Sequence, residues 1–390
     1  MIKYPLLRRK AFSETVKDLF RKLPNKALSI DKAIEEGVAW LGRAQDNSRS
    51  EDGGVARHFS LVSGWGASYP ETTGYIIPTL LAYARVAKGD TVRNRCNRML
   101  DWLVSIQLSD GGFQGGLIDS VPVVPVVFNT GQILMGLAAG VHEFGDKYRE
   151  PMRRAADWLL RNQDLDGCWR KHASPFAMEG EKTYDTHVAW GLLEAARVDH
   201  AGGYAEAALA NVDWALTFQR ENGWFEQCCL EDPQRPFTHT LGYAFRGIVE
   251  AYRYSRSPEL LSACQRTANG LLSTMRLDGF IPGRLDSNWS PAASWVCLTG
   301  SAQIACSWFV LHELTGRVDY LNAARLVNNY LRRTVTIDCR PEVRGALKGS
   351  FPVYGRYCIY EYPNWATKFF IDALMLERFS HESKDTHRQT

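Results

Sequence analysis

The sequence predicts an all-α protein that folds as an (α/α)6 toroid, a closed ring of six helical hairpins. Three observations lead to this fold. A motif repeats about every 56 residues, each repeat contains two different helical patterns, and a long connection recurs at the same place in the repeats. The chain has 390 residues, which is long enough for six such units.

The repeat is marked by a tryptophan, a glutamine five residues later, and then a polar turn that contains glycine. The tryptophan and glutamine pairs are Trp40/Gln45, Trp102/Gln107, Trp158/Gln163 and Trp214/Gln219. With two weaker later copies, the first glycines of the turns stand at positions 53, 111, 167, 223, 279 and 349, so the intervals are 58, 56, 56, 56 and 70 residues. Three equal intervals with one motif indicate copies of a single structural unit.

Each repeat contains two helical patterns that differ in polarity. The pattern before the motif is amphipathic, as in 148–163, where apolar residues recur at spacings of three and four. The pattern after it is apolar on almost every side, as in 132–144, 189–198, 244–252 and 302–314. Since a helix that is apolar all round is a buried one, we expect a half-exposed outer helix and a buried inner helix in each repeat.

The connections within and between the repeats differ in length. Turns from inner to outer helices are short, as at 88–90, 145–146 and 316–319. Connections from outer to inner helices are long, with 23, 23 and 21 residues from Gln107 to Thr130, Gln163 to Thr186 and Gln219 to Thr240. Long loops inside a compact domain are usually functional. A closed ring collects them on one face, and we favour closure because the first and sixth repeats lack the polar surface of capping repeats.

Composition excludes several classes of protein. The formal net charge is only +3, and the chain has no concentrated basic stripe of the kind that binds nucleic acid. No run of about 18 apolar residues predicts a membrane span. The nine cysteines form no spaced framework, and no Cys/His cluster has metal-ligand spacing, so we expect reduced thiols, no metal and no cofactor. Without a secretory leader, the expected location is the cytoplasm.

The chain is expected to divide into a basic amphipathic segment (1–28), the toroid (29–378) and a polar C-terminal tail (379–390). Residues 6–23 combine six Lys and Arg residues with apolar residues at helical spacing. Such a helix can lie on an anionic membrane surface, which would place the protein at the inner face of the membrane. We favour the alternative that the helix packs its apolar side on the body of the protein.

Two segments resemble a known repeat. Gln163-Asp-Leu-Asp-Gly-Cys-Trp169 resembles the repeat motif of squalene and hopene cyclases, and Asp110-Gly-Gly-Phe113 is similar to the repeat of protein prenyltransferase β subunits. The resemblance implies the toroid, with a motif that ties outer helices together. The chain lacks the Asp-x-Asp-Asp and Asp-Asp-x-x-Asp motifs of those families, and Asp338-Cys339 does not have the spacing of their zinc ligands.

A second resemblance concerns the inner helices of the last repeats. The runs 295–305 and 362–374 look similar to toroid proteins encoded with bacterial polysaccharide genes. Toroids of this kind include polysaccharide lyases, unsaturated uronyl hydrolases, sugar 2-epimerases and uronyl C5-epimerases. This resemblance implies a carbohydrate-active enzyme.

The starts of the inner helices are predicted to surround the site. Equivalent positions carry a different side chain in each repeat, namely Glu71, Asn129, Asp185, His239 and Asn364. Such variation at equivalent positions is expected at a ligand site. The converging helix N-termini create a positive potential that suits an anion, and Arg284 and Lys368 are candidates to add to it.

Aromatic residues are predicted to line this mouth. The candidates that stand near the inner-helix starts are Trp65, Tyr69, Phe128, Tyr184, Trp289, Tyr360 and Trp365. Aromatic walls with a few polar groups and positive potential suit an acidic sugar. They would equally suit a prenyl diphosphate, so an isoprenoid enzyme is an alternative.

The predicted reaction is β-elimination or epimerisation of a uronic acid in a glycan or oligosaccharide. Both need a base (His187 or His239), an acid (Tyr69 or Tyr184) and a neutraliser of the carboxylate (Asn129 or Asn364). Hydrolysis would instead use two carboxylates about 5 to 10 Å apart, for which Glu71 and Asp185 are the candidates. A non-catalytic glycan-binding toroid is the third alternative.

Overall fold

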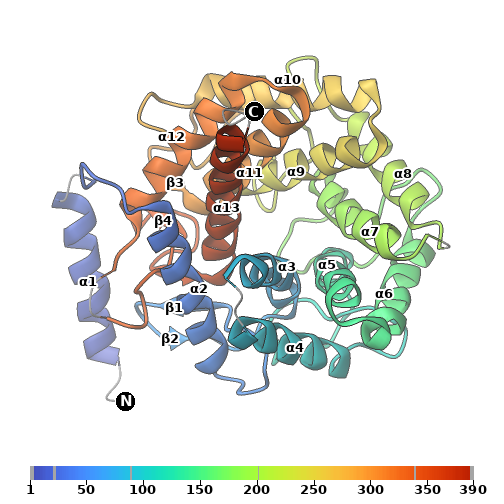
Figure 1. Ribbon diagram of the computed structural model, residues 1–390, viewed down its shortest axis with the longest axis horizontal. Coiled ribbons are helices and arrows are strands. Elements are labelled where there is room, and N and C mark those ends of the chain that lie inside the picture. Colours follow the sequence, from blue (N-terminus) through green and yellow to red (C-terminus); the bar gives the residue numbers. More distant parts are fainter. Residues whose placement is uncertain (1–3, 21–22, 88–89, 201, 338–339, 387–390) are drawn as a thin grey trace.

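The computed structural model describes residues 4–20, 23–87, 90–200, 202–337 and 340–386, and within this part the chain forms a ring of paired helices (Figure 1). The inner helices are α3 (Pro70–Ala87), α5 (Val127–Phe144), α7 (Thr186–Val198), α9 (Thr238–Ser255), α11 (Leu298–Thr315) and α13 (Asn364–Thr386). The outer helices are α2 (Ile30–Asp46), α4 (Asp90–Ser105), α6 (Arg149–Asn162), α8 (Tyr204–Leu216), α10 (Pro258–Thr274) and α12 (Val318–Thr334). The predicted six-hairpin toroid is confirmed.

The ring closes between its first and last repeats. Helix α13 packs against α11 on one side and against α2 and α3 on the other. Next to it, β1 (His58–Ser60) pairs antiparallel with β5 (Glu361–Pro363), with Phe59 opposite Tyr362, and β2 (Gly64–Trp65) adds to β1. A second small sheet joins β3 (Val296–Cys297) to β4 (Ser350–Phe351). The two short helices η1 (Asp146–Tyr148) and η2 (Thr183–Asp185) precede α6 and α7.

The repeat motif connects each outer helix to the next. The Gln163 side chain donates hydrogen bonds to the carbonyl oxygens of Gly167, in its own turn, and of Ala207, in α8, both at 2.9 Å. Gln107 makes the same pair of bonds, to Gly111 and Pro151. The half-buried glutamine therefore satisfies carbonyl groups of two neighbouring repeats, which explains why it recurs.

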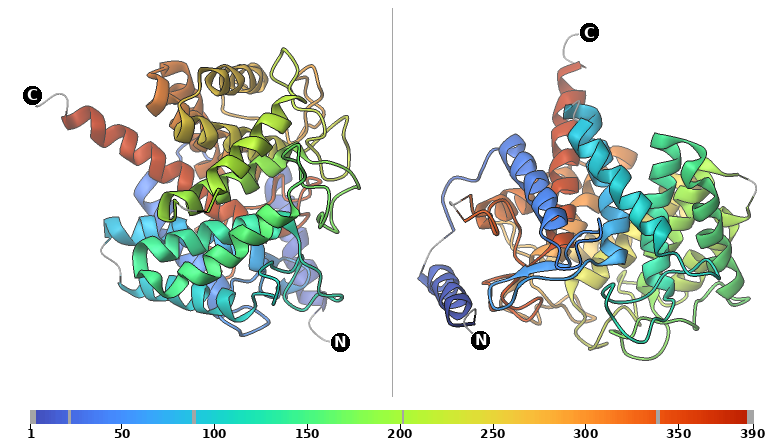
Figure 2. Two further views of the ribbon diagram at one scale, coloured as in Figure 1. Left: turned by 90° about the vertical axis from the view of Figure 1, so that its right-hand side faces the viewer. Right: turned by 90° about the horizontal axis from the view of Figure 1, so that it is seen from below.

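The inner helices are buried as their composition predicts. Almost every residue of α5 and α11 is buried, while the outer helices α4 and α6 bury one face only. The long connections gather on one side of the ring (Figure 2). Helix α13 continues to Thr386, past the predicted toroid boundary at residue 378, so residues 379–386 are helical. Residues 387–390 of the predicted tail lie outside the described residues.

The N-terminal helix α1 (Tyr4–Phe20) lies outside the ring (Figure 1). The favoured prediction, that its apolar side packs on the body, is wrong. Its acidic side faces inward instead: Glu14 and Asp18 both pair with the buried Lys348, at 2.9 and 2.6 Å. None of the helices in the described ranges is long and apolar enough to cross a bilayer.

We expect Lys348→Met to release α1 from the body. The substitution leaves two buried carboxylates without their shared cation, which typically costs a few kcal/mol, about 2–4 here. Limited trypsin digestion should therefore cleave within α1 earlier than in the wild type. Lys32→Met, which removes a half-exposed lysine paired with Glu36, is the control and should leave the digestion pattern unchanged. Equal protection of α1 in both variants would show that the inward ion pairs do not hold it.

Candidate active site

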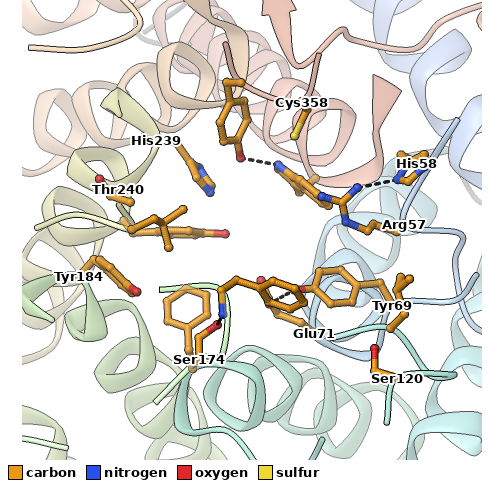
Figure 3. Close-up of a pocket in the computed structure, with 17 residues that line it drawn as sticks. Arg57, His58, Tyr69, Glu71, Ser120, Ser174, Tyr184, His239, Thr240 and Cys358 are labelled. Atoms are coloured by element: carbon orange, nitrogen blue, oxygen red, sulfur yellow. Dashed lines mark hydrogen bonds between the residues drawn. The ribbon is translucent and has the colours of Figure 1, made fainter. Parts of the chain in front are cut away.

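A cavity of about 500 Å³ opens among the starts of the inner helices and the long loops (Figure 3). Its walls come from the region before α3, from α5, η2, α9 and α13, and from loops of several repeats. The lining residues are Arg57, His58, Tyr69, Glu71, Leu117, Ser120, Phe128, Ser174, Phe176, Tyr184, Leu230, His239, Thr240, Tyr243, Tyr357, Cys358 and Trp365. The position at the loop end of the ring is the one that the sequence predicts.

Glu71 is the candidate acid–base group of this cavity. It lies in the first turn of α3 and is 8% exposed, and it accepts a hydrogen bond of 2.8 Å from the Tyr69 hydroxyl. Burial raises the pKa of the Glu71 carboxyl to about 7, although the Tyr69 hydrogen bond and the nearby Arg57 cation both lower it. A carboxyl with this pKa is present in both protonation states near neutral pH, as a general acid or base requires.

Arg57 brings a positive charge to the cavity wall. It stands just before β1, and its Nη1 contacts Glu361 at 2.9 Å and His58 Nδ1 at 2.6 Å. Its guanidinium lies 5.1 Å from the ring centre of Trp365. The hydrogen bonds to Glu361 and His58 both use Nη1, and the Cys358 thiol is a further neighbour of the guanidinium. A guanidinium has five N–H donors, so Arg57 can still donate to an anion bound in the cavity.

His239 faces the cavity from the first turn of α9 (Figure 3). Its Nδ1 lies 3.0 Å from the Gln303 side-chain oxygen, and with this orientation of the amide Nδ1 carries the proton. Nε2 then holds a lone pair. Burial lowers the pKa of His239 to about 4, so the ring is neutral at pH 7 and is a weaker base than a free imidazole.

Aromatic rings form most of the remaining wall. The Tyr243 ring packs 4.4 Å from that of His239 and 5.0 Å from that of Phe128, between centroids. The Trp365 indole donates a 2.8 Å hydrogen bond to the Tyr357 hydroxyl, which fixes both rings. A largely apolar wall with a few fixed polar groups is typical of a small-molecule site.

The structure brings together part of the predicted set of site residues. Tyr69, Glu71, Phe128, Tyr184, His239 and Trp365 line the cavity. His187 and Asp185 are buried and lie outside the lining.

These two residues have different surroundings. His187 Nδ1 contacts the Gln132 side-chain oxygen at 2.7 Å, and burial together with nearby cations holds the pKa of His187 well below its usual range. Burial raises the pKa of Asp185 to about 8, although Lys182 lowers it. The predicted Glu71–Asp185 carboxylate pair is therefore not gathered in this cavity.

The two predicted carboxylate neutralisers are also outside the lining. Asn129 is buried in α5. Asn364 donates hydrogen bonds to the Ala56 carbonyl oxygen and to the Thr72 hydroxyl, and these contacts tie the last repeat to the first. Arg57 takes the place of both as the polar group able to bind a carboxylate here.

The remaining predicted binding residues have other partners. Lys368 lies in a second cavity, where it pairs with Asp372 at 2.7 Å. Arg284 pairs with Glu231 and stacks on Phe237.

Three predicted aromatic residues lie outside the lining as well. Trp289 packs on Trp224 and donates to the Asn222 carbonyl oxygen. Trp65 packs on Trp40 and Phe59, and Tyr360 contacts Thr15 of α1.

Sequence reasoning missed Arg57, His58, Tyr243 and Tyr357 as lining residues. For Tyr243 a signal exists, since it follows His239 by four residues on one helix face. Arg57 and Tyr357 lie in loops outside the repeated pattern, so the alignment of the repeats cannot predict that they line the cavity. Among the residues that the structure describes, no group of three or more His, Cys, Asp and Glu side chains could hold a metal ion.

No protein-family model and no curated protein matches the sequence. Solved structures do match the fold. An unsaturated glucuronyl hydrolase specific for heparin has a TM-score of 0.73 at 15% identity, covering 90% of this chain and 98% of its own. Cellobiose 2-epimerase from Bacillus thermoamylovorans B4167 has a TM-score of 0.69 at 12% identity, covering 90% and 98%.

A third solved structure contains a sugar ligand. It is a mutant unsaturated glucuronyl hydrolase from Streptococcus agalactiae complexed with dGlcA-GalNAc6S, with a TM-score of 0.62 at 13% identity, covering 93% and 94%. At these identities the likeness of the three structures establishes the toroid fold of this chain and not its activity.

Proposed function

We propose that this protein is a carbohydrate-active enzyme that acts on an oligosaccharide with a uronic acid residue. The observation that carries the proposal is the pairing, in one aromatic cavity, of a carboxyl group with a pKa near 7 (Glu71) and a guanidinium (Arg57). The first group can transfer a proton and the second can bind a carboxylate. Support for this substrate class comes from the unsaturated glucuronyl hydrolases that share the fold.

The reaction that best fits a single acid–base carboxyl is hydrolysis of a C4=C5 unsaturated uronyl group. Glu71 would transfer its proton to C4, and a water molecule would add to C5 as its own proton passes to the Glu71 carboxylate. The resulting hemiketal opens to a ketone at C5, which leaves a hemiacetal at C1 that releases the second sugar as an alcohol. This chemistry needs no second carboxylate, in agreement with the position of Asp185 outside the cavity lining.

Proton abstraction from C5, as in epimerisation or elimination, is the second candidate. It is favoured by the neutral imidazole of His239 at the cavity wall. Arg57 would neutralise the carboxylate, which makes the C5 proton more acidic, and Tyr184 or Tyr69 would act as the acid. The predicted base and acid then keep their roles, while Arg57 replaces the predicted asparagines.

One experiment separates these reactions. The protein is incubated in heavy water with unsaturated and saturated uronic-acid oligosaccharides, and the ultraviolet absorbance of the conjugated double bond is followed together with deuterium uptake at C5. Loss of absorbance indicates hydrolysis, and gain indicates elimination. Uptake without a change of absorbance indicates epimerisation. No change of absorbance and no deuterium uptake at C5 over a panel of linkages would contradict the proposal.

Arg57→Ala should weaken the binding of the acidic substrate. Loss of a charge-assisted hydrogen bond corresponds to about 1.5–3 kcal/mol, or roughly a 10- to 100-fold rise in KM. The same variant should lose much less on a substrate whose carboxylate is esterified. Arg317→Ala is a matched control, because Arg317 also pairs with a carboxylate and stacks on an aromatic ring, away from the cavity. An equal loss on both substrates would rule out carboxylate binding by Arg57.

A further inference from the structure

Helix α1 is attached to the body by its acidic side. Glu14 accepts from Lys348 and from Arg340, and Asp18 accepts from Lys348 and from the Val353 amide. Burial would raise the pKa of Glu14, but the neighbouring cations hold it at about 2, so this carboxylate stays charged on the inward side. These ion pairs, together with the buried Ala11, hold the inward side of α1 against the body.

The opposite side of α1 is an exposed apolar stripe formed by Phe12, Val16, Leu19 and Phe20. The two phenylalanines are 72% and 83% exposed, Leu19 is 58% exposed and Val16 is 37% exposed. The spacing of four, three and one residues places these side chains on one face of the helix. A contiguous apolar face that is exposed in this way indicates a surface that binds a partner.

The charge around this stripe is strongly positive. The first 26 residues contain eight basic residues, at positions 3, 8, 9, 10, 17, 21, 22 and 26, and only two acidic ones. Both acidic residues, Glu14 and Asp18, face the body and form ion pairs with Lys348. Lys10 and Lys17 take part in ion pairs with Glu342 and Glu14, while Arg9 is exposed beside the stripe. The exposed stripe therefore carries Arg9 beside it and belongs to a strongly basic segment of the sequence.

We infer that α1 docks the protein on an anionic phospholipid membrane. The phenylalanines and Leu19 would enter the boundary between headgroups and acyl chains, while the basic residues would face the lipid phosphates. Charge complementarity selects this partner, because an apolar protein partner would not require the excess of Lys and Arg. The inference is independent of the proposed enzyme activity.

Flotation with lipid vesicles tests this inference on the full chain. We expect binding to phosphatidylcholine vesicles that contain phosphatidylglycerol, little binding to pure phosphatidylcholine, and loss of binding at high salt. Phe12→Ser/Phe20→Ser should lower the partition coefficient at least tenfold, because each phenylalanine withdrawn from water contributes roughly that factor. Arg9→Glu should weaken binding to the anionic vesicles only.

The matched control is Leu165→Ser/Leu277→Ser, which removes two exposed apolar residues that belong to turns of the ring and not to α1. This variant should bind vesicles like the wild type. Absence of binding to anionic vesicles would overturn the inference, as would equal binding by the α1 variant. Light scattering that shows a dimer broken by Phe12→Ser/Phe20→Ser, without vesicle binding, would overturn it in favour of a second copy of the chain.

Discussion

Replacing Glu71 by glutamine should reduce kcat/KM by about 100- to 10,000-fold, because positioned proton transfer contributes typically 10²- to 10⁴-fold. Glutamine keeps the shape of the side chain and can still interact with Tyr69, but it cannot donate a proton to carbon and then accept one from water. The fold should remain intact. Steady-state kinetics on the substrate identified in the heavy-water experiment measure the loss.

The stability of this variant can be predicted as well. The folded-state pKa of Glu71 lies at about 7, above the usual 4.5, so the carboxyl stabilises the fold fully below pH 4.5 and this contribution is lost as the pH rises through 7. Glutamine is always neutral, so Glu71→Gln should raise the melting temperature relative to wild type at pH 8. The control is Glu194→Gln, a glutamate with a raised pKa that lines the second cavity and should retain activity. Full activity in Glu71→Gln would exclude this residue as the proton donor.

The pH dependence of kcat/KM is a second test of Glu71. If protonated Glu71 is required, kcat/KM should fall tenfold per pH unit above about pH 7. The Tyr69 hydrogen bond lowers the pKa of Glu71, so Tyr69→Phe should move this alkaline limb to higher pH. A purely structural role of Tyr69 would change the rate without moving the limb.

The toroid could be predicted because its signal is local and repeated. Gln107 and Gln163 make the same two hydrogen bonds in successive repeats. Because each repeat needs a donor for these two carbonyl oxygens, glutamine recurs at a constant interval. The burial of each inner helix likewise leaves an apolar sequence on all sides. The small sheets leave no such trace, since strands of two or three residues are too short to show a periodicity.

The site could be predicted only where it follows the repeat. Glu71 and His239 lie in the first turns of α3 and α9, and both line the cavity. Arg57 reaches the cavity because β1 pairs with β5, about 300 residues further along the chain, and no local pattern reports such a pairing. Lys368 lies a turn deeper in α13 than Trp365, and this places it in the second cavity.

Gly167→Ala should cause a large loss of stability. Gly167 has φ +90°, which alanine adopts only with strain, and an added Cβ would lie 2.3 Å from the carbonyl oxygen of Ala210 in α8. The same turn is held by Gln163 and by Asn211, whose side chains both donate to the Gly167 carbonyl oxygen. Because helix backbone must move to admit the methyl group, we expect the free energy of unfolding to fall by about 3–5 kcal/mol.

Gly180→Ala separates the two causes of this loss. Gly180 has a similar φ of +103°, but nothing lies within 4 Å of its added Cβ. The free energy of unfolding of Gly180→Ala should therefore fall only by the cost of the strained backbone, about 1–2 kcal/mol. Chemical denaturation of both variants measures the difference, and this difference reports how closely the turn approaches α8. Equal losses would show that the close approach of the turn to α8 adds nothing to the cost of the strained backbone.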